Sequence, residues 1–384
     1  MGVPRVSFVV PCYKLAHVLP ECVNSILAQT YGDFEVLIMD DRSPDHTAEV
    51  ANSFNDRRIC HIRNEENLGH LRNYNKGITL SRGKYVWLIS ADDYLRRPYV
   101  LERYVNLMEQ HPRVGYAFCP GVGVQNGKES ETLGYSQYGH SDRIVDGHHF
   151  LSNLLEYNRV VAASVLTRRD CYENISLFPL DAHWAGSPVE MGWVGDWYLW
   201  CVFALYFDIA YFAEPMVCYR EHELSITVAL TQNTMAACIA ADVAVPWLIK
   251  QKADEMGLAK LSERCLFGAA NQYARYAAAR RYRSSISSMS IEQIELSLCH
   301  STKSEWERNW IRSRTFAGWA DQLSLREEAS SAARMYLRAL RKDPRMAGVY
   351  PKLLLLALGK PGSHLRAMLR FLRLRVGSLL SLGQ

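Results

Sequence analysis

The sequence predicts an open α/β sheet followed by a helical region. Apolar runs alternate with amphipathic stretches from residue 6 to residue 91, in a β-α-β-α-β-α-β order. The apolar runs contain hardly any polar position, as expected of parallel strands that helices cover on both faces. Beyond about Ser225 the strand signal stops.

The expected elements follow one another closely. Strands are expected at 6–10, 34–39, 59–62 and 85–89, and helices at 18–29, from about Thr47, and at 71–80. Residues 115–164 are expected to be rich in loops with short strands, and the apolar run 209–219 closes the α/β region. We therefore divide the chain into an α/β domain (1–226), a helical extension (227–350) and a basic amphipathic tail (351–384).

Basic residues gather at the C-terminal end. The net charge is only +4, but residues 344–384 contain seven Lys or Arg and no Asp or Glu. A nucleic-acid-binding protein carries its basic residues over a face of the folded domain, so we expect no nucleic-acid partner. Within 363–382, apolar side chains share one helical face and Arg366, Arg370 and Arg373 share the opposite one. This predicts a helix that binds an anionic membrane surface, with docking on protein as the alternative.

Nothing in the sequence indicates secretion. The chain enters an expected strand by Val6, which leaves no room for a signal peptide, and no apolar run has the length of a membrane span. The ten cysteines form no CxxC pair and show no metal-ligand spacing. We interpret them as reduced core residues of a cytoplasmic protein.

Polar residues follow three of the expected strands. In open α/β sheets, ligands bind beyond the carboxyl ends of the strands. Pro11-Cys12-Tyr13 follows the first strand, Asp40-Asp41 the second and Asp92-Asp93 the fourth. The sequence near the first strand lacks the Gly-rich loop of a sugar nucleotidyltransferase and the GxGxxG of a nicotinamide dehydrogenase, which argues against both enzymes.

Six motifs resemble, in order, those of family 2 glycosyltransferases. They are FVVPCYK (8–14), SILAQTYGDFEVLIMDDRSPD (25–45), NLGHLRNYNKGI (67–78), GKYVWLISADD (83–93), GDWYLW (195–200) and YREHELSIT (219–227). The resemblance covers roughly the first 225 residues. It implies the GT-A nucleotide-diphospho-sugar transferase fold, a Rossmann-like open mixed sheet, and transfer of a sugar with inversion at the anomeric carbon.

The resemblance implies a divalent metal site at Asp92-Asp93. Asp93 would bind Mg²⁺ or Mn²⁺, and Asp92 would bind the ribose or the metal. A hard cation held by carboxylates can neutralise the diphosphate leaving group. Many relatives carry a further Asp where this chain has Ser90. The alternative is that the pair caps a helix that follows it.

The resemblance also assigns donor nucleotide binding to Pro11, Tyr13, Asp41 and Arg72. The Asp41 carboxylate can accept the N3 hydrogen of uracil or thymine, and Tyr13 can stack on the base. The Arg72 guanidinium can clamp phosphate oxygens. Asp41 could instead belong to a turn in which Ser43 is a helix N-cap, and Arg72 could be a solvated helix residue.

Asp196, in GDWYLW, matches the position of the family's general base. Apolar neighbours would raise its pKa, which suits removal of a proton from an acceptor hydroxyl. Most relatives carry Glu-Asp where this chain has Gly195-Asp196, and a helix cap is the alternative role.

Arg220 and His222 are expected over the donor diphosphate, with solvated charges as the alternative. Trp184 and Trp193 are expected to form an acceptor platform, with a place in the core as the alternative.

These observations predict a metal-dependent inverting glycosyltransferase. It would use a UDP- or dTDP-sugar and a glycan or lipid-linked acceptor, at the cytoplasmic face of a bacterial inner membrane. The expected pathway is cell-surface polysaccharide assembly, such as that of O-antigen or capsule. The alternative is a non-catalytic glycan-binding or scaffold subunit with the same fold.

Overall fold

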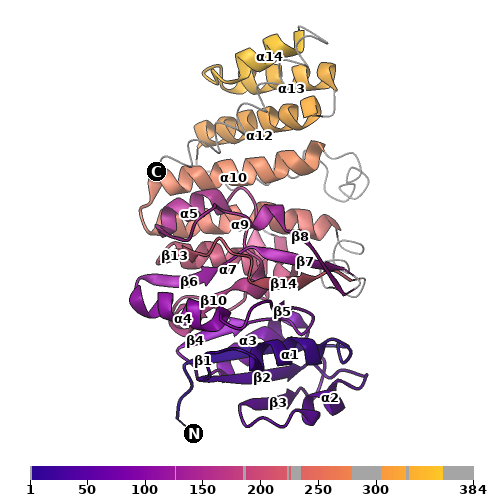
Figure 1. Ribbon diagram of the computed structural model, residues 1–384. Coiled ribbons are helices and arrows are strands. Elements are labelled where there is room, and N and C mark those ends of the chain that lie inside the picture. Colours follow the sequence, from indigo (N-terminus) through magenta and orange to yellow (C-terminus); the bar gives the residue numbers. More distant parts are fainter. Residues whose placement is uncertain are drawn as a thin grey trace. The chain divides into compact units, whose positions relative to one another are not determined.

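The computed structural model describes residues 2–125, 127–184, 187–222, 225, 235–278, 304–325 and 328–357. The chain forms two compact units, one of Met1–Ala182 with Glu190–Asn233 and one of His183–Val189 with Thr234–Gln384. Figure 1 shows both units, coloured along the sequence. The predicted helix at 363–382 lies outside the described residues.

An eight-stranded mixed sheet forms the centre of the first unit (Figure 1). Its strands, in spatial order, are β3 (Ile59–Arg63), β2 (Phe34–Asp40), β1 (Val6–Cys12), β4 (Tyr85–Leu88), β10 (Leu166–Arg168), β6 (Val114–Phe118), β13 (Asp208–Tyr211) and β9 (Arg143–Val145). The first four strands pair in parallel, while β10 and β9 run antiparallel to their neighbours. The predicted α/β class and the four N-terminal strands are confirmed.

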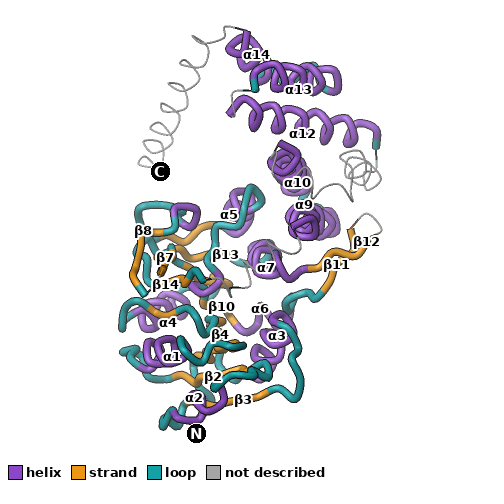
Figure 2. Tube along the Cα trace, turned by 90° about the vertical axis from the view of Figure 1, so that its right-hand side faces the viewer, coloured by secondary structure: helices purple, strands orange, loops and turns teal. Residues whose placement is uncertain are grey.

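In the part of this unit that the structure describes there are seven α-helices. They are α1 (Leu19–Leu27), α2 (Thr47–Ser53), α3 (His70–Leu80), α4 (Val100–Gln110), α5 (Gly147–Leu154), α6 (Arg169–Asn174) and α7 (Gly195–Ala204). In Figure 2, α1 and α4 lie on one side of the sheet and α3 lies on the other. The N-terminal strands are therefore covered on both faces, which explains why β1 and β2 are buried at every position.

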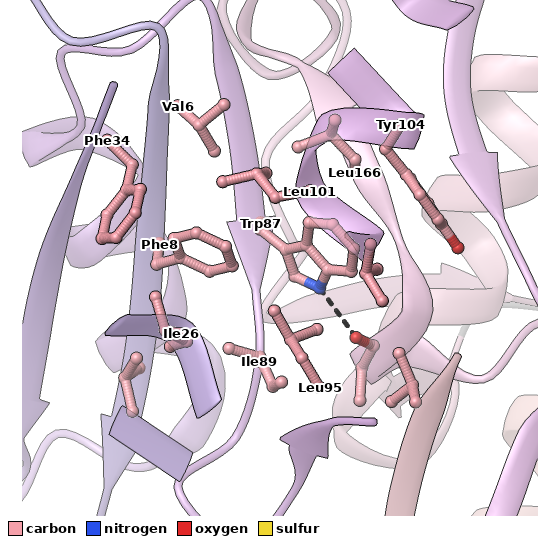
Figure 3. Close-up of a cluster of buried hydrophobic side chains, with 14 of the residues drawn as sticks. Val6, Phe8, Ile26, Phe34, Trp87, Ile89, Leu95, Leu101, Tyr104 and Leu166 are labelled. Atoms are coloured by element: carbon pink, nitrogen blue, oxygen red, sulfur yellow. Dashed lines mark hydrogen bonds between the residues drawn. The ribbon is translucent and has the colours of Figure 1, made fainter. Parts of the chain in front are cut away.

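The two faces of the sheet use alternate residues of each strand. On the side of α1 and α4, Phe8 stacks on Trp87, and the indole nitrogen of Trp87 donates a hydrogen bond to the Ala163 carbonyl at 2.8 Å (Figure 3). On the other side, Gly77 of α3 lies against Val9, where an added Cβ would come within 2.4 Å of a Val9 methyl group. Glycine at this position lets α3 approach the sheet closely.

Residues 115–164 are more regular than the sequence indicates. A second sheet has the order β5 (Tyr94–Leu95), β14 (Val217–Arg220), β7 (Gly121–Gln125) and β8 (Lys128–Thr132). β7 and β8 form an antiparallel hairpin, and β14 joins β7 in parallel. β14 and β5 escape a periodicity argument because β14 pairs with strands that lie far away in the sequence.

Two alternative roles considered for strand-end residues are wrong. Asp92-Asp93 leads into β5 and not into a helix, since α4 begins at Val100 after Tyr99. Ser43 is not a helix N-cap, because α2 begins at Thr47 after His46. Instead, the Ser43 hydroxyl accepts a hydrogen bond from the Lys14 amide at 3.2 Å, and so joins the ends of β1 and β2.

The described part of the second unit beyond residue 234 is helical. Its helices are α9 (Met235–Glu255), α10 (Ala259–Ala278), α12 (Glu305–Leu325), α13 (Ala329–Lys342) and α14 (Val349–Ala357), each packed on the one before it in this list (Figure 2). A hairpin of β11 (Asp181–Trp184) and β12 (Ser187–Glu190) spans the boundary between the units. Among the described helices, none is long and apolar enough to cross a membrane.

Candidate active site

Backbone hydrogen bonds draw the ends of the central strands together. The Asp41 amide donates to the Cys12 carbonyl at 3.0 Å, and the Ala91 amide donates to the Pro11 carbonyl at 3.1 Å. Lys14 and Arg42, which follow β1 and β2, have φ angles of 60° and 56°. Non-glycine residues seldom adopt this left-handed conformation, and strain of this kind gathers at functional sites.

Asp41 is almost fully buried and holds the loop before α3. One carboxylate oxygen accepts from the Asn64 amide group and from the Leu68 backbone N–H, both at 2.8 Å. The other accepts from the Gly69 backbone N–H at 2.9 Å. The carboxylate therefore organises this loop, and its second oxygen retains an acceptor position. The Asp40 carboxylate accepts a hydrogen bond from the Ser43 amide at 2.7 Å, which is a structural role.

The other predicted nucleotide residues differ in exposure. Tyr13 is 42% exposed, and the Lys14 ammonium lies 5.1 Å from the centre of its ring. A flat aromatic face is therefore open to a ligand beyond β1. Pro11 is buried within β1. Arg72 is exposed on the first turn of α3.

Asp92 and Asp93 lie between β4 and β5. Asp93 accepts a hydrogen bond from the Arg220 backbone N–H at 2.9 Å, and Asp92 accepts one from the His222 imidazole at 2.8 Å. The second carboxylate oxygen of Asp92 is buried and has no hydrogen-bond partner among the described residues. Burial, followed by the charge of Asp92, raises the pKa of Asp93 well above its ordinary value.

This arrangement suits a cation, although it is not a complete ligand cage. Among the described residues, no group of three or more His, Cys, Asp or Glu side chains could hold a metal ion. Asp92 nevertheless keeps a carboxylate oxygen without a described partner. Beside it, burial and the charge of Asp92 raise the pKa of Asp93, and a cation would relieve this repulsion. Mg²⁺ commonly takes one or two protein carboxylates and completes its shell with water and substrate phosphates, so the two residues fit such an ion.

Arg220 and His222 both have carboxylate partners. Arg220 forms an ion pair with Glu21 of α1, and its Nε donates to the Asp92 carbonyl at 3.0 Å. His222 contacts the Asp92 side chain. Neither is simply a solvated charge, because these contacts fasten the end of β14 to the aspartate pair. Glu21 was missed by the sequence argument, since α1 meets β14 only in the tertiary structure.

Asp196 lies in the first turn of α7. Its carboxylate accepts from the Trp197 backbone N–H at 2.6 Å and from the Asn158 amide group at 3.1 Å. Burial raises its pKa to about 6, although both hydrogen bonds act in the opposite direction. A carboxylate of this kind can accept a proton near neutral pH. The residue before α7 is Val194, so Asp196 is not the helix N-cap.

Close packing explains the glycine before Asp196. A Cβ on Gly195 would lie 3.2 Å from the Phe178 ring and 3.3 Å from a Leu71 methyl group. The Glu that many relatives carry here would have to displace these side chains. Phe178 is itself bound to α3, because its backbone N–H and carbonyl pair with the Asn75 amide group at 2.9 and 2.8 Å.

Two tyrosines that sequence reasoning missed share the surroundings of these carboxylates. After burial, the largest causes that raise the Tyr74 pKa are the charges of Asp92, Asp196 and Asp93. Desolvation, Tyr219, Asp196 and Asp93 raise the pKa of Tyr135. Helical spacing from Leu71 could have indicated Tyr74, which lies three residues later, but nothing local could have indicated Tyr135.

The two predicted acceptor residues, Trp184 and Trp193, precede α7 in the chain. Trp193 ends a short 3₁₀ turn (Met191–Trp193) before α7 and is partly exposed. The Gly192 carbonyl in that turn contacts the His70 imidazole at 3.1 Å, which ties the turn to α3. The backbone of Trp184 lies in β11, and its side chain is outside the described set.

One family model matches part of the chain. Residues 7–158 match the glycosyl transferase family 2 model. Over these residues the chain is similar to glycosyl transferase family 2. The match includes the strand ends with Asp41, Asp92 and Asp93, but it stops before Asp196.

Curated relatives of this chain are glycosyltransferases by name. Glycosyltransferase GlyA of Streptococcus pneumoniae is 25% identical over 243 residues, which cover 62% of this chain and 33% of GlyA. The PGL/p-HBAD biosynthesis glycosyltransferase of Mycobacterium tuberculosis is 34% identical over 115 residues, or 29% of this chain and 44% of the relative. The chain therefore aligns with less than half the length of these relatives.

Solved structures support the predicted GT-A fold. Residues 1–349 of Staphylococcus aureus TarS, solved with UDP-GlcNAc, superpose with a TM-score of 0.56 at 14% identity, over 91% of this chain and 92% of TarS 1–349. At this identity the likeness concerns the fold alone. It agrees with the fold that the motifs predict.

Proposed function

We propose that this protein is a metal-dependent, inverting glycosyltransferase. It transfers one sugar from a UDP- or dTDP-sugar to a glycan or lipid-linked acceptor. The observation that carries the proposal is the common environment of three carboxylates. Asp92 and Asp93 follow β4, Asp196 lies in the first turn of α7, and the charges of all three contribute to the raised pKa of Tyr74. The leaving-group residues and the general base therefore share an electrostatic neighbour.

The donor diphosphate occupies the Asp92-Asp93 end of this space. Asp93, with Asp92 beside it, holds Mg²⁺ or Mn²⁺, which supplies positive charge to the diphosphate as it leaves. The unpartnered oxygen of Asp92 and the raised pKa of Asp93 support this role. Arg220 and His222 border the same phosphates, and they also hold the aspartate pair against β14.

The donor nucleotide lies beyond β1 and β2. Tyr13 stacks on the base, and Asp41 accepts its N3 hydrogen through the carboxylate oxygen that binds only Gly69. Pro11 supports this edge through its bond to Ala91, and Arg72 approaches the phosphates from α3. Uracil and thymine present the same N3 hydrogen, so both nucleotides fit.

Asp196 acts at the acceptor. Its carboxylate accepts the proton of an acceptor hydroxyl while the acceptor oxygen forms a bond to the anomeric carbon. The bond from that carbon to the diphosphate breaks on the opposite face, and the diphosphate leaves with the electron pair. One displacement inverts the anomeric configuration. Trp193 contributes to an acceptor platform, for which the sequence also nominates Trp184.

The cellular setting is part of the proposal. The enzyme works at the cytoplasmic face of a bacterial inner membrane, held there by the basic residues near its C-terminus, and contributes to cell-surface polysaccharide such as O-antigen or capsule. The names of the curated relatives, which include a glycolipid biosynthesis glycosyltransferase, are compatible with this setting.

Donor hydrolysis tests the proposal. The purified protein is incubated with Mn²⁺ and UDP-glucose, UDP-galactose, UDP-N-acetylglucosamine or dTDP-glucose, and nucleotide release is measured without acceptor. A transferase slowly releases UDP or dTDP from its donor, and EDTA abolishes the release. Binding of a sugar nucleotide with no hydrolysis, and no transfer to any glycan, would favour the non-catalytic glycan-binding subunit. With an acceptor, NMR coupling constants must show an inverted anomer.

A further inference from the structure

We propose that Asn64, Asn73 and Lys76 are positioning residues that keep Asp41 a hydrogen-bond acceptor, so that the site selects uracil or thymine over cytosine. The inference rests on the proposed function and deepens its nucleotide subsite. Asn64 directly follows β3, while Asn73 and Lys76 lie on α3. The sequence argument assigned no role to these three side chains.

The Asp41 carboxylate contacts donors on both of its oxygens. Two of its hydrogen bonds come from the Leu68 and Gly69 backbone N–H groups, and the third comes from the Asn64 amide group. A carboxylate has about four acceptor positions, so one stays open among the described residues, on the oxygen that binds Gly69. A ligand group that binds there must donate a hydrogen.

The Asn64 side chain uses all of its hydrogen-bonding groups. It is 3% exposed, and its amide nitrogen donates to the Asp41 carboxylate at 2.8 Å and to the Asn73 side-chain oxygen at 2.9 Å. Its own oxygen accepts from the Lys76 ammonium at 2.7 Å. Because an ammonium can only donate and a carboxylate can only accept, these two partners fix the direction of the amide.

Asn73 ties this network to β2. It is 2% exposed, and its amide nitrogen donates to the carbonyl of Met39, which lies in β2 two residues before Asp41, at 2.9 Å. The Asn64 backbone N–H also donates to the Asp40 carbonyl at 2.9 Å. The ends of β2 and β3 are thus joined to α3 around one carboxylate. Its direction is set before a ligand arrives, which lowers the entropy lost on binding.

The open acceptor position distinguishes the pyrimidine bases. Uracil and thymine carry a hydrogen on N3, whereas neutral cytosine has a lone pair there. The Asp41 oxygen would accept the N3 hydrogen of the first two bases but would face the lone pair of cytosine. A site that leaves a buried polar group without its partner rejects the analogue that lacks the donor. The network that orients Asp41 therefore sets the choice of base.

The test measures base discrimination in the full-length protein. Wild type, Asn64→Asp and Lys76→Met are titrated calorimetrically with UDP and with CDP in Mn²⁺ at pH 7.5. In wild type, we expect the dissociation constant of CDP to exceed that of UDP at least about tenfold, the effect of one hydrogen bond to a charged group. Asn64→Asp sets a second carboxyl against Asp41, so the pair shares a proton and the ratio should fall about five- to tenfold. Lys76→Met frees the amide to turn and should lower the ratio about two- to fivefold.

Two controls make the same charge changes elsewhere. Asn106→Asp adds a carboxylate at an exposed position of α4. Lys84→Met removes an ammonium whose described partner is the partly exposed carboxylate of Glu109. Both should leave the ratio of the two dissociation constants at its wild-type value. If Asn64→Asp does not fold, the partly exposed position of Lys76 allows Lys76→Met to decide the question.

The other outcomes overturn the inference in distinguishable ways. Equal weakening of UDP and CDP in the site variants would show that the network only supports the fold. Equal binding of both nucleotides by wild type would show that Asp41 does not select the base. In either case, donor hydrolysis by wild type would leave the proposed function standing. A wild-type protein that neither binds these nucleotides nor hydrolyses any of the four sugar nucleotides would reject both.

Discussion

Burial acts on two carboxyl groups of the candidate site, with different consequences. Both Asp93 and Asp196 have raised pKa values. Asp93 lies beside a second carboxylate, so a cation relieves the repulsion. Asp196 instead accepts hydrogen bonds from neutral donors, Asn158 and the Trp197 amide, and can exchange a proton with substrate. The neighbouring groups therefore suit Asp93 to bind a metal ion and Asp196 to act as a base.

We expect Asp196→Asn to lower kcat at least about 100-fold with little change in donor affinity, because the amide cannot accept the proton. In wild type, kcat/KM should fall as pH drops below about 6, since protonation removes the base. The raised pKa also means that this carboxyl stabilises the folded state less as pH rises from about 4 to 6. The variant should therefore melt no lower than wild type at pH 7.5. Wild-type turnover in the variant would contradict the assignment.

Asp93→Asn tests the metal site. Removing one charge from a buried carboxylate pair should leave the melting temperature in EDTA unchanged or higher, because burial disfavours the ionised form. The rise in melting temperature that Mn²⁺ with UDP produces in wild type should disappear, since a ligand stabilises only a state that it binds. Glu49→Gln, on the exposed side of α2, is the control. Full activity of Asp93→Asn in excess EDTA would exclude the metal role.

At the scale of elements, α3 joins the two halves of the candidate site. It packs on β1, β2 and β4, whose ends carry the donor residues, and His70 and Asn75 bind the segments that precede α7. The sequence identifies α3 as a helix but selects Arg72 as its functional side chain. Tyr74 is the α3 residue that lies near all three carboxylates, and residues two apart do not share a helix face.

Asn75→Ala tests this connection. The change removes two hydrogen bonds to the Phe178 backbone and leaves those groups without a partner, so the free energy of unfolding should fall by about 1–3 kcal/mol. Because Tyr74 and α7 both rest on Phe178, kcat should fall as well, even under conditions where the variant is fully folded. Thr79→Ala, at an exposed position of the same helix, should change kcat little. Denaturant titration and turnover assays measure both effects, and an unchanged kcat in Asn75→Ala would show that α3 and α7 act independently.

At the scale of the whole molecule, the carboxylates of the candidate site lie within the first compact unit, and Arg366, Arg370 and Arg373 lie outside the described residues. A chain deleted from about Pro361 onward should therefore retain activity on a water-soluble acceptor. It should no longer co-sediment with phosphatidylserine vesicles, because anionic lipid contributes about 1 kcal/mol for each nearby basic side chain.

Reversing three charges in the tail tests the same membrane contact in a chain of full length. Arg366→Glu, Arg370→Glu and Arg373→Glu together should abolish sedimentation without shortening the chain, and salt should weaken the wild-type interaction. A truncated protein that melts much lower in the absence of vesicles would show that the tail packs on protein.

The sequence by itself determined the fold class, the four parallel strands and the positions of Asp92, Asp93 and Asp196. Those features follow from local hydrophobic periodicity and from contiguous motifs at strand ends. Only the tertiary structure decided that Glu21 pairs with Arg220, that the Phe178 ring lies close to Gly195, and that Tyr74 packs on Phe178. Each of these contacts joins residues far apart in the chain, and side chains meet there only because the sheet order and the packing of α3 bring them together.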